Sequence, residues 1–192
     1  MWAAKLALRD QLMTHRGRLA VAVIGERARA VSDHVLATPE ARRAATVAAY
    51  VSVGREPGTG PLLEALRAAG KRVILPLLQP DNDLDWGEYD GPAALRTARM
   101  GLLEPDTRAL GPDAIGTADV VLVPGLAVAR DGTRLGRGGG CYDRALGRVP
   151  VGTLVCAVLN SEEVLHTVPR DAHDRPVDAV VTEEGVLRLG RG

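Results

Sequence analysis

A glycine-rich segment between two arginines carries the clearest chemical signal in this sequence. Arg134 and Arg137 flank Gly136, and three further glycines follow at positions 138–140. Glycine has no Cβ atom, so its backbone N–H groups can approach an anion closely, and arginine matches the geometry of phosphate oxygens. Asp143 follows three residues after the last glycine, where a carboxylate could hold a metal ion that bridges phosphates. The segment predicts a polyphosphate site, with a flexible turn between a strand and a helix as the alternative.

Two cations near the start of the chain could extend this site. Lys5 and Arg9 are four residues apart, which places them on one face of the expected first helix. A polyphosphate would relieve their mutual repulsion, so we expect both to bind one; a solvated basic face is the alternative. Lys5 is also one of only two lysines in an arginine-rich chain.

Other candidates lie in segments that flank expected strands. Glu56 follows a buried strand, where its carboxylate could accept hydrogen bonds from a ligand or could be an ordinary turn acid. Trp86 could stack on a flat ring or could fill core space. Asp174 precedes the last expected strand and could be a second magnesium ligand beside Asp143, because Mg²⁺ takes hard oxygen ligands. His173 is expected to be structural or to contact substrate rather than to bind Mg²⁺.

Strands alternate with helices along the chain, and this order predicts how the candidates are positioned. It implies right-handed crossovers and a mostly parallel sheet. We therefore predict one α/β domain over residues 1–192, a Rossmann-like three-layer fold with helices on both faces and ligands at the carboxyl ends of the strands. We expect helices over 2–15, 18–37, 61–69 and from the glycines to about Arg148; strands over 46–53, 72–77, 119–123, 152–159 and 178–181; a polar, turn-rich segment over 81–91; and an irregular stretch over 93–118.

The composition excludes several classes of protein. The formal net charge of the 192 residues is zero, which favours neither a nucleic-acid partner nor a membrane-surface partner. No apolar run approaches a membrane span, and charged residues interrupt the first 25 positions, which argues against a signal peptide. Cys141 and Cys156 are the only cysteines, so a disulfide framework is not expected. We expect a cytoplasmic monomer that acts on a small molecule.

The motifs, in their order along nearly the whole chain, resemble the 5-formyltetrahydrofolate cyclo-ligase (methenyltetrahydrofolate synthetase) family. The specific part is residues 132–144, which read Gly-x-Arg-Leu-Gly-Arg-Gly-Gly-Gly-x-Tyr-Asp-Arg. The weaker matches are Lys5 with Leu8-Arg9, Glu56-Pro57 with Thr59, Gly70-Lys71 before Leu75-Pro76, Glu104-Pro105, Val123-Pro-Gly-Leu-Ala, and His173-Asp174 with Asp178 and Thr182.

The resemblance implies ATP-dependent ring closure of 5-formyltetrahydrofolate to 5,10-methenyltetrahydrofolate, with release of ADP and phosphate and a requirement for Mg²⁺. In the family chemistry the formyl oxygen is phosphorylated, the other folate nitrogen attacks, and phosphate leaves. The resemblance implies that Asp143 and Asp174 hold Mg²⁺ and that Lys5, Arg134 and Arg137 are catalytic. The implied ATP site is Lys5, Arg9, Arg134, Leu135, Gly136, Arg137, Gly138, Gly139, Gly140, Cys141 and Tyr142. The implied folate site is Val51, Glu56, Trp86, Arg137, Gly138, Gly139, Gly140 and Cys141.

The chain departs from the family pattern at two places. Cys141 stands where the family usually has the first of two tyrosines, so an aromatic hydroxyl is lost and folate affinity is expected to change. Val128-Ala129 replaces the usual Phe-Asp, which removes an aromatic ring and an acid. Neither departure removes a phosphate-binding or metal-binding group.

Two other functions stay open on the sequence alone. A folate- or nucleotide-binding module of the same family would bind its ligands without turnover. A sugar-phosphate isomerase or an acyl-CoA-type transferase on a similar scaffold would act without ATP, the transferase with Glu56 or Glu104 as its carboxylate.

Overall fold

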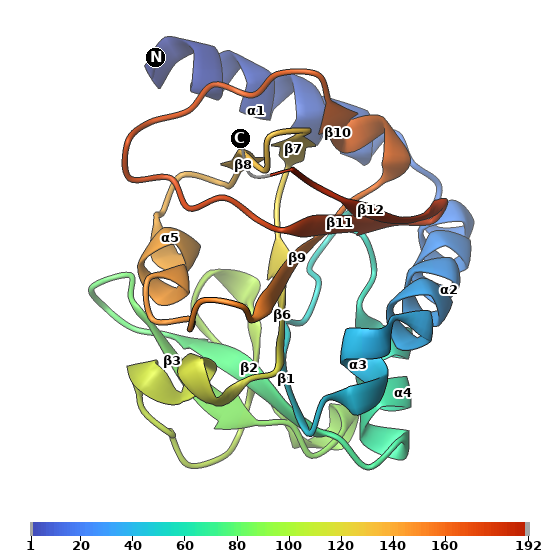
Figure 1. The fold of residues 1–192 in the computed structure, drawn as a ribbon, viewed down its shortest axis with the longest axis vertical. Helices are drawn as coiled ribbons and strands as arrows, with labels where there is room; N and C mark the ends of the chain where they lie inside the picture. Colours follow the sequence, from blue (N-terminus) through green and yellow to red (C-terminus); the bar gives the residue numbers. More distant parts are fainter. Residues whose placement is uncertain (1, 191–192) are drawn as a thin grey trace.

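A seven-stranded, mostly parallel sheet forms the centre of the molecule (Figure 1). The structure, a computed structural model, describes residues 2–190. The sheet has the order β12-β11-β9-β6-β1-β2-β3, and its five inner strands run parallel. The outer strands β12 and β3 pair antiparallel with their neighbours. The strands are β1 (Thr46–Ala48), β2 (Arg72–Leu78), β3 (Leu84–Glu88), β6 (Val120–Pro124), β9 (Leu154–Val158), β11 (Ala179–Thr182) and β12 (Gly185–Arg188).

Helices cover both faces of this sheet, as the sequence predicts. Because successive strand residues point to opposite faces, Val73 and Leu75 join one buried cluster whereas Ile74 joins the other. The first cluster lies under the longer helices, and the second lies under short ones, so the second helical layer is thin. The first layer contains α2 (Val21–Ala37), α3 (Pro39–Arg43) and α4 (Gly60–Ala68); the second contains the 3₁₀ helix η3 (Pro112–Thr117) and α5 (Cys141–Leu146).

The first helix, α1 (Trp2–Gly17), lies across a separate small sheet rather than on the main one (Figure 1). This sheet has the order β10-β7-β8 and packs against Leu12 of α1. This packing places Arg9 of α1 against the segment that contains the glycines and Lys5 against Asp174. The small sheet consists of β7 (Ala127–Ala129), β8 (Arg134–Leu135) and β10 (Val164–Leu165).

The strand expected over 46–53 is shorter than predicted, because side chains replace the sheet as hydrogen-bond partners. β1 ends at Ala48, and the Ser52 N–H donates to the Thr59 hydroxyl at 2.9 Å. The Val53 N–H donates to the Glu56 carboxylate at 2.9 Å. The chain therefore leaves the ladder early and forms a loop at the carboxyl edge of the sheet.

Residues 81–91 contain a strand where only turns were predicted. β3 buries Leu84 and Trp86, which share one face of the strand, while Asp85 between them is partly exposed and Glu88 at the strand end is exposed. An edge strand tolerates acids such as these two, and they obscured the apolar alternation in the sequence. The segment just before the glycines forms a hairpin, β7–β8. The stretch over 93–118, expected to be irregular, contains only short elements: the hairpin β4–β5 and 3₁₀ helices. Besides η3, these are η1 (Pro92–Ala94), β4 (Leu95–Thr97), η2 (Arg99–Gly101) and β5 (Leu103–Pro105).

Two further observations concern the whole described chain. Within residues 2–190, no helix combines the length and the apolarity that crossing a bilayer requires. Cys141 and Cys156 are both free thiols, and burial raises the pKa of Cys156 to about 12.

Candidate active site

The β7–β8 hairpin places Arg134 at the carboxyl edge of the main sheet. Its guanidinium donates to the carbonyl of Pro124, the last residue of β6, at 3.1 Å, and to the Asp143 carboxylate at 3.0 Å. The same guanidinium lies 5.8 Å from the centre of the Tyr142 ring. The side chain is 4 % exposed, and in the described part of the chain its Nε has no hydrogen-bond partner. Because this Nε is buried, the guanidinium can attract a nearby anion through its fixed charge rather than through that donor.

The glycine loop, residues 136–140, wraps around a cation from the first helix. Arg9 Nε donates to the Gly136 carbonyl at 2.9 Å. A Cβ on Gly138 would lie 3.4 Å from the Arg9 guanidinium carbon, and this glycine has φ +104°, a conformation that other residues rarely adopt. Glycine at position 138 is therefore favoured by the backbone conformation, whereas a Cβ would meet Arg9 only at ordinary van der Waals distance. Beside the loop is a cavity of about 810 Å³, whose lining includes Gly138, Gly139, Gly140, Asp143, Arg144, Arg170, His173 and Asp174.

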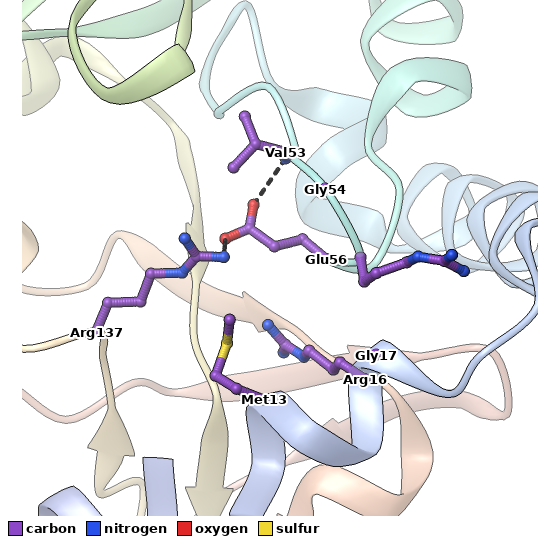
Figure 2. Close-up of a pocket in the computed structure, with 8 residues that line it drawn as sticks. Met13, Arg16, Gly17, Val53, Gly54, Glu56 and Arg137 are labelled. Carbon is purple, nitrogen blue, oxygen red and sulfur yellow. Dashed lines mark hydrogen bonds and ion pairs between the residues drawn. The ribbon is translucent and has the colours of Figure 1, made fainter. Parts of the chain in front are cut away.

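A second, smaller cavity lies where the glycine loop meets the loop after β1. Arg137 Nη2 is 3.0 Å from Glu56 Oε1, and the other carboxylate oxygen accepts the Val53 N–H. Figure 2 shows Arg137 and Glu56 pointing toward one another, with Met13 and Arg16 of α1 beside them. Glu56 is 8 % exposed, so an unpaired N–H of a ligand would find a preoriented acceptor here. This cavity has a volume of about 250 Å³.

Lys5 crosses from α1 to an acidic turn, residues 171–174. Its Nζ lies 2.6 Å from Asp174 Oδ2 and 2.7 Å from Asp171 Oδ2. Burial opposes the charge on Lys5, but the hydrogen bonds to both carboxylates outweigh it and raise the lysine pKa. Burial likewise opposes the charge on Asp174, yet the Asp171 N–H and Lys5 together lower the pKa of that carboxyl. Both partners are therefore ionised near neutral pH.

The acidic turn also has the donor chemistry that a magnesium ion needs. One ligand atom from each of Asp171, His173 and Asp174 lies within 4.8 Å of the others. Two of these groups are carboxylates, and they already hold a cation, the Lys5 ammonium, which stands where a metal would be attracted. Asp143 lines the larger cavity together with His173 and Asp174, but it lies outside this group of three possible ligands. Its carboxylate pairs instead with Arg134 and accepts the Arg175 N–H at 3.1 Å.

Sequence reasoning missed a buried ion pair that anchors the first helix. Arg16 and Glu163 form two hydrogen bonds of 2.6 and 2.7 Å, and their side chains are 2 % and 1 % exposed. Arg16 also donates to the Gly125 carbonyl, and Asn160 donates to Glu163 from both its backbone and its side chain. No local pattern signals this pair, because the partners are 147 residues apart in the chain. By contrast, Asp171 could have been predicted as a site residue from the sequence, since it precedes the candidate Asp174 by three positions in a turn.

Two tyrosines lie near Glu56, the buried Tyr50 and the partly buried Tyr142. Burial, and then the negative charge of Glu56, raise the pKa of Tyr50 and of Tyr142, so both phenols stay protonated. The Tyr50 hydroxyl has no hydrogen-bond partner among residues 2–190. Tyr50 was not among the predicted site residues; it follows β1 by two positions and is 4 % exposed.

Three residues named from the sequence lie away from both cavities. Trp86 is 1 % exposed in β3 and packs in the core, which favours its alternative role of filling space. Val51 is partly buried and packs against the other core cluster. Glu104 accepts the Leu78 N–H at 2.8 Å in a buried position of β5. Leu135, predicted to contact ATP, is likewise 1 % exposed and packs in the small core under α1. The charged residues and glycines predicted for the site do come together, from α1, β8, the glycine loop, α5, the loop after β1 and the acidic turn.

The fold and the site together define a class of protein. It is an α/β protein with a glycine-rich, cation-flanked loop at the carboxyl edge of a mostly parallel sheet. Comparison with known proteins assigns it to one family within this class: the sequence model of the 5-formyltetrahydrofolate cyclo-ligase family matches residues 2–183. The chain belongs to that family.

Individual relatives agree with this assignment. The 5-formyltetrahydrofolate cyclo-ligase of Mycolicibacterium smegmatis is 44 % identical over 150 residues, which cover 75 % of this chain and 77 % of the relative. The Escherichia coli protein of the same name is 34 % identical over 165 residues, 81 % of this chain and 87 % of the relative. The solution structure of the Aquifex aeolicus 5,10-methenyltetrahydrofolate synthetase superposes with a TM-score of 0.83 at 32 % identity, covering 98 % of this chain and 94 % of that one.

Proposed function

We propose that this protein catalyses the ATP- and Mg²⁺-dependent cyclisation of 5-formyltetrahydrofolate to 5,10-methenyltetrahydrofolate, with release of ADP and phosphate. The observation that carries the proposal is the convergence of Arg9 and Arg134 on the glycine loop, next to the Glu56–Arg137 pair. Membership of the cyclo-ligase family supports the same reaction. It also disfavours an isomerase or an acyl-CoA-type transferase, which would need no ATP.

In this proposal, cations and backbone N–H groups hold the triphosphate. Phosphoryl transfer requires alignment and charge neutralisation rather than a covalent protein nucleophile. Arg134 fits this role because its guanidinium is held by Pro124 and Asp143 beside the first glycine of the loop, Gly136. Arg9 lies against the glycine loop, and Lys5 pairs with Asp174, which lines the cavity beside that loop.

The folate would lie on the other side of the glycine loop. Glu56 is oriented by the Val53 N–H, and it is the acceptor we assign to N–H groups of the pterin ring. Arg137 bridges from the loop to Glu56, so it stands between the two proposed substrates and can stabilise charge on the phosphorylated formyl group. Preoriented groups of this kind reduce the reorganisation needed during the reaction.

Asp143 and Asp174 would hold Mg²⁺, since both are carboxylates that line the larger cavity. When bound there, Mg²⁺ would neutralise phosphate charge and help to orient the group that is transferred. We also propose that the protein acts as a monomer in the cytoplasm.

The test is to incubate the purified protein with 5-formyltetrahydrofolate and Mg²⁺, with and without ATP, and to follow the absorbance of the methenyl product. We expect product only when ATP is present, and a reduced rate in an Asp143→Asn variant. Product formed without ATP would contradict the proposal.

One alternative function is a binding module without turnover. The observation that favours it is Cys141, which lacks the aromatic hydroxyl usual at this position in the family. Tight folate binding with no product and no folate-dependent ATP hydrolysis would support that alternative. ATP hydrolysis that depends on the folate would exclude it. Restoring the hydroxyl with Cys141→Tyr would then show whether this position limits folate binding.

A further inference from the structure

Lys5 occupies the place of a cation in the acidic turn. Its ammonium is shared between one oxygen of Asp171 and one of Asp174, at 2.7 and 2.6 Å, and the residue is 6 % exposed. The same two carboxylates belong to the group whose ligand atoms lie within 4.8 Å of one another. The Lys5 ammonium and a divalent metal ion would thus be attracted to the same carboxylate oxygens.

Two positive ions cannot share these oxygens without strong repulsion, because the pair is shielded from solvent. We propose that the Lys5 ammonium and the divalent cation compete for the carboxylate of Asp174, and that Asp171 is a positioning residue that keeps Lys5 when the metal takes Asp174. This inference rests on the nucleotide and metal binding in the proposed function, and it goes beyond that function by making the two events depend on each other.

A second pair of the same kind supports this exchange. Arg134, proposed to bind phosphate, is hydrogen-bonded at 3.0 Å to Asp143, proposed to bind metal. Two of the three proposed phosphate-binding cations, Lys5 and Arg134, are therefore paired in this structure with the proposed metal-binding carboxylates. A triphosphate offers Lys5 and Arg134 a new anionic partner, which releases the carboxylates for the metal. Nucleotide and metal should then bind with positive coupling, through exchange of partners rather than through a distant conformational change.

The experiment measures Mn²⁺ binding to the nucleotide-free protein by electron paramagnetic resonance, with isothermal titration as a second method. In Lys5→Met the competing charge is gone and the carboxylates are free, so we expect Mn²⁺ to bind roughly tenfold more tightly than to the wild type. Lys5→Arg keeps a charge that can hydrogen-bond both acids, and its Mn²⁺ affinity should stay near the wild-type value.

The chain offers a matched control in its only other lysine. Lys71 donates to the carbonyls of Arg42 and Ala44, outside both cavities, so Lys71→Met should leave Mn²⁺ affinity unchanged. Thermal melts of each variant show whether it is folded. Unchanged or weaker Mn²⁺ binding in folded Lys5→Met would overturn the proposal. This outcome is distinct from failure of the proposed function, which is decided by product formation in the wild type.

A double-mutant comparison tests the role of Asp171. Asp171→Asn leaves Lys5 dependent on Asp174 alone, so we expect it to weaken Mn²⁺ binding in the wild type. In the Lys5→Met background the same substitution should have a clearly smaller effect, because no ammonium needs a partner. Equal losses in both backgrounds would show that Asp171 is simply a metal ligand and would overturn its positioning role.

Discussion

Arg137 and Glu56 join the glycine loop to the loop after β1 through a contact of 3.0 Å. The Arg137 side chain is 52 % exposed, whereas that of Glu56 is 9 % exposed, so the arginine faces solvent and the acid is enclosed by the protein. A fixed carboxylate that borders a cavity is suited to orient a ligand, and an exposed arginine can turn to follow it. The pair thus connects the proposed nucleotide site to the proposed folate site.

Replacing Glu56 with glutamine should weaken folate binding more than catalysis. The amide keeps the size of the side chain but loses the charge-assisted hydrogen bonds, which are worth about 1.5–3 kcal/mol. We therefore expect the KM for 5-formyltetrahydrofolate to rise at least about tenfold, with a smaller change in kcat. Steady-state kinetics measure both. Glu88→Gln, at an exposed acid of the β3 edge, is the control and should leave KM unchanged; an equal KM for Glu56→Gln and wild type would remove Glu56 from the folate site.

The buried Arg16–Glu163 pair should control the stability of the molecule. Glu163→Gln leaves the Arg16 guanidinium without a counter-charge in the interior, where breaking a pair costs about 3–5 kcal/mol. Urea denaturation should show a loss of this size. Glu40→Gln, which breaks the exposed pair with Arg188, should cost less than about 1 kcal/mol. Similar losses in the two variants would mean that burial does not determine the contribution of the ion pair.

Tyr50→Phe should stabilise the ligand-free protein. The variant removes a buried hydroxyl that lacks a hydrogen-bond partner within residues 2–190, and it keeps the ring that packs in the core. Leaving such a group buried costs about 1–3 kcal/mol, so we expect the free energy of unfolding to rise by about 1 kcal/mol. Chemical denaturation of both proteins measures the difference. A loss of stability would show that the hydroxyl has a partner in solution, such as a bound water.

The ion pair between Asp83 and Arg148 should make stability depend on acid pH. The hydrogen bond from Arg148, at 2.9 Å, lowers the pKa of the Asp83 carboxyl in the folded protein. A carboxyl with a lowered folded-state pKa stabilises the protein above its unfolded pKa, about 3.9, and this contribution disappears as the pH falls through the folded-state pKa.

Asp83→Asn is the variant that isolates this contribution. Because both side chains are partly exposed, we expect a loss of at most about 1 kcal/mol at pH 7. The stability difference between Asp83→Asn and the wild type should shrink in denaturation curves recorded at progressively lower pH below about 4. A difference that stays constant down to pH 2 would assign the effect to packing rather than to charge.

The sequence predicted most of the fold because the signals involved are local. Short apolar runs such as 120–123 and 155–158 are typical of buried strands, and the helical segments between strands favoured parallel crossovers. The errors arose where hydrogen bonds or neighbours far along the chain decide the outcome. β1 is short because Thr59 and Glu56 satisfy its continuing backbone, and β3 is a strand because β2 offers it an edge.

For the candidate site, too, local signals indicated the residues, whereas long-range packing decided their partners. Residue types and spacing by themselves identified the glycine loop, its arginines, Lys5, Glu56 and the two aspartates, because those types have a chemistry that does not depend on the fold. Only the tertiary structure decided which of them are partners. Lys5 meets Asp171 and Asp174, Arg16 meets Glu163, and Arg137 meets Glu56, in each case across more than eighty positions of the chain. Such pairings follow from how α1 and the loops pack at the edge of the sheet, and packing is a property of the whole chain that no local pattern contains.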